Sequence, residues 1–282
     1  MRDISVIIVT WNSADEIVKC VGSVIEASKG LNTELIIIDN NSADNSLALV
    51  KNISFPQLNT VQNSENLGYT KAVNQGIKLS NGKYVLLLNP DTVLNDNSIN
   101  IMYDYLEANP VYGACAPLMK NPDGSTQYSV RNFPTYWRMF CEFSLLAYIF
   151  PHTKLFGSWK AKYMDYSTEQ DIRQPMAAAF MIRAELLRKI DNMDERFRMF
   201  FNDVDICKKV YDAGFKIRLL PASVVTHEHG VSIKKDRANM IKIWNDDCVK
   251  YFEKHFGGGL SLLWLKINLK ISGIIRVFIA KK

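Results

Sequence analysis

The stretch Tyr84-Val85-Leu86-Leu87-Leu88-Asn89-Pro90-Asp91-Thr92 decides the fold. Its first five residues form a continuous apolar and aromatic run, which predicts a strand buried on both faces, as in a parallel sheet. Pro90 ends this strand because proline has no backbone N–H to donate. Ligands of open α/β sheets bind at the carboxyl edge, so the sequence predicts Asp91 at the mouth of a site. Asp91 as a simple helix cap is the alternative.

Apolar runs alternate with helical patterns on both sides of this stretch. We expect three further strands and two helices, the first capped by Ser13: strands at 5–10, 35–38 and 59–62, and helices at 14–27 and 69–80. Strand and helix alternate at the spacing of βαβ units. The sequence therefore predicts an α/β fold with a mostly parallel central sheet and helices on both faces.

Short polar clusters follow the predicted strands. They are Thr10-Trp11-Asn12, Asp39-Asn40-Asn41, Asn66-Leu67-Gly68 and Asn89-Pro90-Asp91. Because the carboxyl ends of parallel strands meet at one edge, we expect a crevice lined with Asp and Asn side chains. The GxGxxG fingerprint and the GxxxxGK[ST] phosphate loop are both absent from the sequence. Their absence argues against a dehydrogenase or an ATPase.

Two further polar clusters lie in the second half of the chain. In Phe201-Asn202-Asp203-Val204-Asp205 we expect a helix to begin near Asp203 and to stop at Gly214. A helix N-terminus stabilises a carboxylate, so Asp203 is either a cap or an ionised group able to accept a proton. The cluster His227-Glu228-His229 follows a short apolar run. It is either structural or part of a metal or diphosphate site.

The segment 133–166 is rich in aromatic residues, including Trp137, Phe140, Phe143, Tyr148, Phe150, Phe156 and Trp159. One interpretation is a pair of helices that covers the core. The other is an apolar wall beside an acceptor that has a lipid part.

The overall composition excludes several classes of protein. With 48% hydrophobic and 22% charged residues among 282, the chain resembles a folded protein rather than a disordered one. Its five cysteines have no CxxC spacing, which argues against a zinc site and favours reduced thiols in a cytoplasmic protein. An apolar strand begins near the start of the chain, so we expect no signal peptide.

The tail, residues 233–282, is basic, with 11 Lys and Arg against 4 Asp and Glu. After a hinge at Gly257-Gly258-Gly259, we expect an apolar helix that contains Lys266, Lys270 and Arg276. Burying these three cations in a bilayer would cost ~2.5–3.5 kcal/mol each. We therefore expect an amphipathic helix on an anionic membrane surface rather than a spanning helix, and no nucleic-acid partner. The alternative is a helix docked on the protein or on a second subunit of a homo-oligomer.

In this order, the clusters resemble the inverting glycosyltransferases of family 2, which have the GT-A fold. The matching runs are residues 6–12, 36–42, 66–69, 87–91, 194–195, 201–207 and 227–232. The NPD and DVDIC pieces look most like the rhamnosyltransferase branch. The resemblance implies a GT-A domain over 1–232, with a nucleotide-sugar-binding half at 1–118 and an acceptor and catalytic half at 119–232. The tail 233–282 would follow it.

The resemblance also implies a role for each matching residue. The donor nucleotide would be bound by Asp39 with Thr10, Trp11, Asn12 and Asn41, and the same pocket would include Asn66, Gly68, Lys71, Asn89 and Asp91. Asp91 occupies the place of the DxD motif and would bind Mg²⁺ or Mn²⁺ with His227, or with His229 in its place. Asp203 would be the general base. Asn89 replaces the first Asp of DxD, Asn202 stands where many relatives have Glu, and Asp205 is expected to be structural.

The function implied is sugar transfer with inversion, from dTDP-L-rhamnose or, next, from a UDP-hexose. The acceptor would be a polyprenyl-diphosphate-linked or other glycan in cell-surface polysaccharide biosynthesis, at the inner face of the plasma membrane. A nucleotidyltransferase would carry a glycine-rich basic loop after its first strand, which Thr10-Trp11-Asn12 is not. A non-catalytic sugar- or membrane-binding module would not need Asp91, Asp203 and His227 together.

Overall fold

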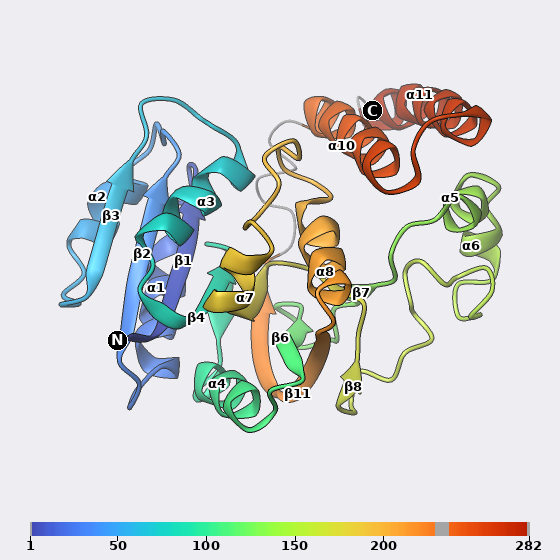
Figure 1. Ribbon diagram of the computed structural model, residues 1–282. Helices are drawn as coiled ribbons and strands as arrows, with labels where there is room; N and C mark the ends of the chain where they lie inside the picture. The colour runs from blue at the N-terminus through green and yellow to red at the C-terminus, as the bar shows by residue number, and fades with distance from the viewer. Residues whose placement is uncertain (1, 229–236, 281–282) are drawn as a thin grey trace.

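The computed structural model describes residues 2–228 and 237–280 and is built around one nine-stranded sheet (Figure 1). The strand order is β3-β2-β1-β4-β10-β6-β11-β5, with β8 paired to β11. The bounds are β1 Arg2–Thr10, β2 Thr33–Asp39, β3 Leu58–Gln62, β4 Gly82–Leu88, β5 Thr92–Leu94, β6 Tyr112–Lys120, β8 Gln170–Asp171, β10 Ala179–Arg183 and β11 Lys216–His227. A separate pair joins β7 (Val130–Arg131) to β9 (Gln174–Pro175).

The first four strands in the order, β3 to β4, are all parallel. The apolar residues of β2, β1 and β4 are almost completely buried, whereas those of the edge strand β3 are partly buried. This confirms the strands predicted from the apolar runs. The sheet is nevertheless mixed, because β10 lies antiparallel between β4 and β6, and β5 and β8 are antiparallel to β11. The sheet is mostly parallel, as predicted.

Helices cover both faces of the sheet, and each face has its own core. One face packs against α1 (Ile17–Ala27), α2 (Ser46–Lys51) and α4 (Ser98–Ala108), and the other against α3 (Tyr69–Leu79), α7 (Ala184–Lys189) and α8 (Asn202–Asp212). The prediction that Ser13 caps the first helix is wrong. Helix α1 begins at Ile17, because a turn intervenes and the Ser13 hydroxyl donates to the Trp11 carbonyl instead.

The tail folds onto the domain as two helices, α10 (Arg237–Phe256) and α11 (Leu260–Ala280), joined by the three glycines. Gly257 and Gly259 have φ of 74° and 114°, values that favour glycine at this turn. With α5 (Tyr136–Phe143) and neighbouring loops, these helices form a third core. The tail thus packs on the protein, as the docked-helix alternative expects. Within the described ranges, no helix is long and apolar enough to span a bilayer.

All five cysteines are free and buried. Cys20 and Cys115 lie in the core beneath α1 and α4, Cys207 in the core beneath α8, and Cys248 in the third core. Burial raises the thiol pKa of each, to about 12 for Cys20. None of the five forms a disulfide in the described structure, and their reduced state in a cytoplasmic protein stays a prediction.

Candidate active site

A cavity of about 670 Å³ is lined by residues at the carboxyl ends of β1 and β4 and by residues of α10. This is the crevice expected from the polar clusters. Seven residues predicted for the site line it: Trp11, Asn66, Gly68, Asn89, Asp91, Asp203 and His227. They come from segments more than 200 residues apart, so the sheet topology brings them together.

Asp91 and His227 meet because β5 pairs antiparallel with the end of β11, which sets His227 opposite Thr92. The Asp91 carbonyl also accepts a hydrogen bond of 3.0 Å from the Glu228 N–H. As a result, His227 Nε2 lies 3.3 Å from Asp91 Oδ1, and their side chains are only 3% and 14% exposed. His229 lies outside the described residues.

Gln127 fixes the orientation of the His227 ring. Its Oε1 lies 2.9 Å from His227 Nδ1, while its Nε2 donates to Asn121 Oδ1 and to the His227 carbonyl. Since the Gln127 amide nitrogen faces other acceptors, Oε1 is the atom that meets the ring, and Nδ1 carries the proton. The lone pair of a neutral imidazole then lies on Nε2, on the Asp91 side, as in a histidine that ligates a metal.

The donor set fits a divalent cation. In the described part of the chain, Asp91 Oδ1 is buried and accepts no hydrogen bond, although buried carboxylate oxygens normally have a partner. Ligands at about 2.1 Å in an octahedral shell lie about 3 Å apart, close to the observed spacing. The described residues contain no cluster of three or more His, Cys, Asp or Glu suited to a metal. Substrate oxygens and water would therefore complete the shell.

Asp203 lies in the first turn of α8, after Phe201 in the left-handed conformation (φ 59°). Its Oδ1 accepts the Val204 N–H at 2.8 Å, and its Oδ2 accepts Gln174 Nε2 at 2.9 Å. Burial raises the pKa of Asp203 and outweighs Val204 and Arg131, which lower it. The expected helix N-terminal stabilisation is present but is not the larger effect, so Asp203 is a stronger base than an exposed aspartate.

Several lining residues were not predicted from the sequence, and they make the Asp203 side of the cavity both cationic and aromatic. Arg131 and Arg198 line the cavity, and the Arg131 guanidinium lies 5.6 Å from the ring of Trp159. Trp159 in turn packs against Trp244 of α10 at 6.3 Å. Arg131 lies in a two-residue strand and Trp244 in the tail, so no local pattern marked either one. Trp159 is the residue of the aromatic segment's seven that lines this cavity in the described structure, and its place beside an acceptor stays a prediction.

Five residues predicted for donor binding, Thr10, Asn12, Asp39, Asn41 and Lys71, do not line the main cavity in the described structure. Asn12 Oδ1 accepts the Ala43 N–H, which ties the β1 and β2 loops together, and buried Asp39 accepts the Ser42 N–H through Oδ2 within the loop after β2. Lys71 is exposed beside a second hollow of about 380 Å³. The roles of these five stay predictions.

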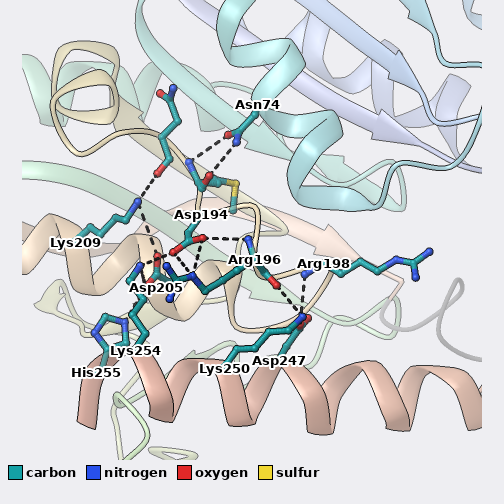
Figure 2. Close-up of polar contacts among 12 residues, drawn as sticks. Asn74, Asp194, Arg196, Arg198, Asp205, Lys209, Asp247, Lys250, Lys254 and His255 are labelled. Carbon is teal, nitrogen blue, oxygen red and sulfur yellow. Dashed lines mark hydrogen bonds and ion pairs between the residues drawn. The ribbon is translucent and has the colours of Figure 1, made fainter. Parts of the chain in front are cut away.

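Helix α10 holds the loop that precedes Asp203 (Figure 2). The buried carboxylate of Asp247 accepts the backbone N–H groups of Arg198, Met199 and Phe200, at 3.4, 3.2 and 3.0 Å. Three consecutive N–H groups around one carboxylate fix the path of a loop. Because Arg198, Met199 and Phe200 all line the cavity, α10 shapes the site although it lies in the predicted tail.

A second contact ties α10 to α8 itself (Figure 2). Asp205 Oδ1 is 2.7 Å from Lys254 Nζ and 2.8 Å from His255 Nε2, and its side chain is 1% exposed. Burial pushes the pKa of Asp205 up, but the hydrogen bonds from His255 and Lys254 outweigh it and lower the pKa. Asp205 lies outside the cavity lining of the described structure, as expected of a structural residue.

Solved structures resemble this fold over nearly its whole length. The mannosyltransferase PcManGT from Pyrobaculum calidifontis, in complex with GDP-Man and Mn²⁺, has a TM-score of 0.62 and 16% identity, covering 100% of this chain and 75% of its own. GalNAc-T7 with UDP, GalNAc and Mn²⁺ has a TM-score of 0.61 and 17% identity, covering 96% and 54%. Identities this low establish the fold alone, which is the GT-A fold expected from the sequence.

Sequence relatives include the N-acetylglucosaminyl-diphospho-decaprenol L-rhamnosyltransferase of Mycobacterium tuberculosis (strain ATCC 25618 / H37Rv). It is 26% identical over 229 residues, which are 76% of this chain and 73% of the relative. The poly(ribitol-phosphate) beta-N-acetylglucosaminyltransferase TarP of Staphylococcus aureus (strain N315) is 33% identical over 116 residues, 39% of this chain and 34% of its own. The family model described as Glycosyl transferase family 2 matches residues 5–191, more than half of the sequence. The order of strand-end clusters, the fold and this match agree, and the chain belongs to glycosyl transferase family 2.

Proposed function

We propose that this glycosyltransferase moves L-rhamnose from dTDP-L-rhamnose, with inversion, onto a polyprenyl-diphosphate-linked glycan in cell-surface polysaccharide biosynthesis. The observation that carries the proposal is that Asp203 and the Asp91–His227 pair line one cavity. Similarity to a transferase named for L-rhamnose and a decaprenol-linked substrate supports this donor and acceptor. A UDP-hexose is the second candidate donor, supported by the UDP bound in GalNAc-T7, a solved structure that resembles this fold.

On the donor side, Asp91 and His227 would hold Mg²⁺ or Mn²⁺. When bound, the cation neutralises charge on the leaving diphosphate. Trp11, Asn66, Gly68 and Asn89 line the same side of the cavity and would bind the rest of the donor. Thr10, Asn12, Asp39 and Asn41 would bind the nucleoside from the ends of β1 and β2 and the loops that follow them, and Lys71 would lie towards the phosphates.

On the acceptor side, Asp203 would act as the general base. Its carboxylate takes the proton of the acceptor hydroxyl while that oxygen bonds to the anomeric carbon. The bond from this carbon to the diphosphate oxygen breaks at the same time, and the nucleoside diphosphate leaves with the electron pair. Attack from the face opposite to the leaving group inverts the anomeric centre. Gln174 and the Val204 N–H orient the carboxylate for this transfer.

We place the transferase domain at residues 1–232, with halves at 1–118 and 119–232, and the basic tail at 233–282. The tail carries 11 Lys and Arg against 4 Asp and Glu, which supports a peripheral position on the inner face of the plasma membrane. A lipid-linked acceptor would be reached from there.

Calorimetric binding of dTDP and UDP, with and without Mg²⁺ or Mn²⁺, tests the donor assignment. We expect metal-dependent binding by the wild type that Asp91→Ala abolishes, and tighter binding of dTDP than of UDP. Tighter UDP binding would favour the UDP-hexose alternative. Failure of both nucleotides to bind under every metal condition would refute the proposed reaction.

A further inference from the structure

Helix α11 carries apolar residues on two opposite faces. On the inner face, Leu262, Leu265 and Leu269 are buried in the third core. The outer face is a stripe of side chains that are 50–86% exposed: Leu260, Leu263, Ile267, Ile271, Ile274 and Ile275. Residues three and four apart share a face of a helix, so these side chains form one continuous strip. A monomer rarely leaves so long an apolar strip in water unless something binds it.

The strip continues onto α5 and α6 (Leu146–Ile149), which lie beside the end of α11 (Figure 1). The ring of Phe140 lies 6.3 Å from Trp264 of α11 and stacks on Trp137 at 5.6 Å. The exposed residues here are Trp137, Phe140, Leu145, Tyr148, Ile149, Phe150 and Leu155. We call these residues and the outer strip of α11 the outer apolar surface. Because ring contacts join its two parts, it is one surface rather than two patches.

The charges around the outer apolar surface are mostly positive, although Glu142 pairs with Lys160 at 2.6 Å and Glu253 pairs with Lys266 at 2.8 Å. Residues 254–282 contain six Lys and Arg, and residues 144–163 contain three Lys, with no Asp or Glu in either segment. On α11, Lys266 and Lys270 lie one turn apart along the border between its two apolar faces. A second copy joined through the same surface would bring like charges together. An anionic bilayer instead complements these cations and accepts Trp and Tyr in its interfacial layer.

We propose that the outer apolar surface docks on an anionic lipid bilayer, with α5, α6 and α11 lying side by side in its interface. This inference deepens the proposed function and rests on it for the identity of the acceptor. The Arg276 guanidinium of α11 lies 5.1 Å from the ring of Trp244, which lines the cavity. Only α10 and α11 would therefore separate the cavity from the membrane surface, where a lipid-linked acceptor would be held.

Sedimentation with phosphatidylcholine vesicles, with and without phosphatidylglycerol, tests the docking. The full chain is compared with Ile267→Asp/Ile271→Asp on α11 and Tyr148→Asp/Ile149→Asp on α6. The matched control is Val111→Asp, since Val111 is equally exposed, at 52%, but lies outside the surface. We expect each double variant to lower the partition onto phosphatidylglycerol vesicles by roughly 10-fold or more, because buried apolar area is lost. The control should bind as the wild type does.

Two results would overturn the docking proposal. The first is that the wild type does not bind phosphatidylglycerol vesicles, or that both double variants bind as well as the control. The second is a dimer in light scattering that Ile267→Asp/Ile271→Asp converts to a monomer, which would make a second copy the occupant. Nucleotide binding without vesicles is measured on the same proteins. If the wild type does not bind nucleotide, the proposed reaction is refuted whether or not the protein binds vesicles. If the double variants still bind nucleotide, their loss of vesicle binding supports docking.

Discussion

The two sides of the cavity are held in place in different ways. On the donor side, Asn40 bonds to Asn66 and Asn63, and Asn63 bonds to Gln75, so an amide network joins loops within 36 residues of one another. On the acceptor side, the loop before Asp203 depends on a carboxylate almost 50 residues further along the chain, in α10. The donor side is therefore stabilised by contacts among its own neighbouring loops, whereas the acceptor side is stabilised by α10 of the tail.

This difference predicts that substitutions can impair the function of one side of the cavity without impairing the other. A variant on the acceptor side should lose transfer while it still binds nucleotide, and a variant at the metal pair should lose both. The contact between α10 and the acceptor loop should affect stability as well as transfer.

The largest effect is expected for Asp203→Asn. Removing the base should lower turnover by ~10²–10⁴-fold, while donor binding stays unchanged because the proposed partner of Asp203 is the acceptor hydroxyl and not the nucleotide. Turnover with a lipid-linked acceptor and calorimetric nucleotide binding measure the two effects. An active Asp203→Asn variant would remove Asp203 from the mechanism.

On the donor side, Gln127→Ala probes the metal pair without changing a ligand. Loss of the contact to His227 Nδ1 frees the ring to rotate, and such changes lower metal affinity by roughly 10–100-fold. Titration of Mn²⁺ in the presence of the nucleotide measures this loss. Nucleotide binding at saturating Mn²⁺ should recover, which distinguishes the loss of metal affinity from misfolding. Unchanged Mn²⁺ affinity would argue against His227 as a ligand.

Asp247→Ala tests the contact from α10. It leaves three backbone N–H groups of the acceptor loop without their carboxylate, so we expect a loss of about 1–3 kcal/mol in the free energy of unfolding. The matched control is Lys250→Ala, because the Lys250 side chain is 41% exposed in its ion pair with Asp247. That change should cost less than about 1 kcal/mol. Urea unfolding measures the free energy of unfolding of both variants. An equal loss in the two would contradict the role of Asp247 in stabilising the loop.

The smallest expected effect is on the pH profile. Burial raises the pKa of Asp203, so the base is protonated, and kcat/KM falls, at a higher pH than for an exposed aspartate. Arg131 lowers this pKa. Arg131→Gln should therefore move the acid limb to higher pH. The control Arg173→Gln, a cation stacked on Tyr211, should leave the limb in place. A shift to lower pH would show that Arg131 does not act on Asp203.

The same contrast explains what could be predicted from the sequence. Asn89, Asp91, Asn66 and Gly68 were found because each directly follows or connects an apolar run, and buried parallel strands end at one edge. Asp203 was found from its place at a helix start. Arg131 and Trp244 were not, because they line the cavity from the β7–β9 pair and from the tail. Gln127 was not found either, because it contacts His227 from a loop 100 residues earlier in the chain, and only long-range packing brings the two together. For residues 260–280 the sequence indicated either a basic helix on a membrane surface or a helix docked on the protein. The buried face of α11 agrees with docking, and the membrane role stays a proposal.

The buried cysteines give this molecule a built-in set of chemical reporters. A thiol of raised pKa inside a core reacts with an alkylating reagent only when its surroundings open. Cys20 and Cys115 report on one face of the sheet, Cys207 on the other, and Cys248 on the tail. Labelling followed by peptide mass spectrometry would therefore give a separate opening rate for each core without any mutation. We expect Cys248 to react before Cys20, since the tail opens without unpairing the sheet.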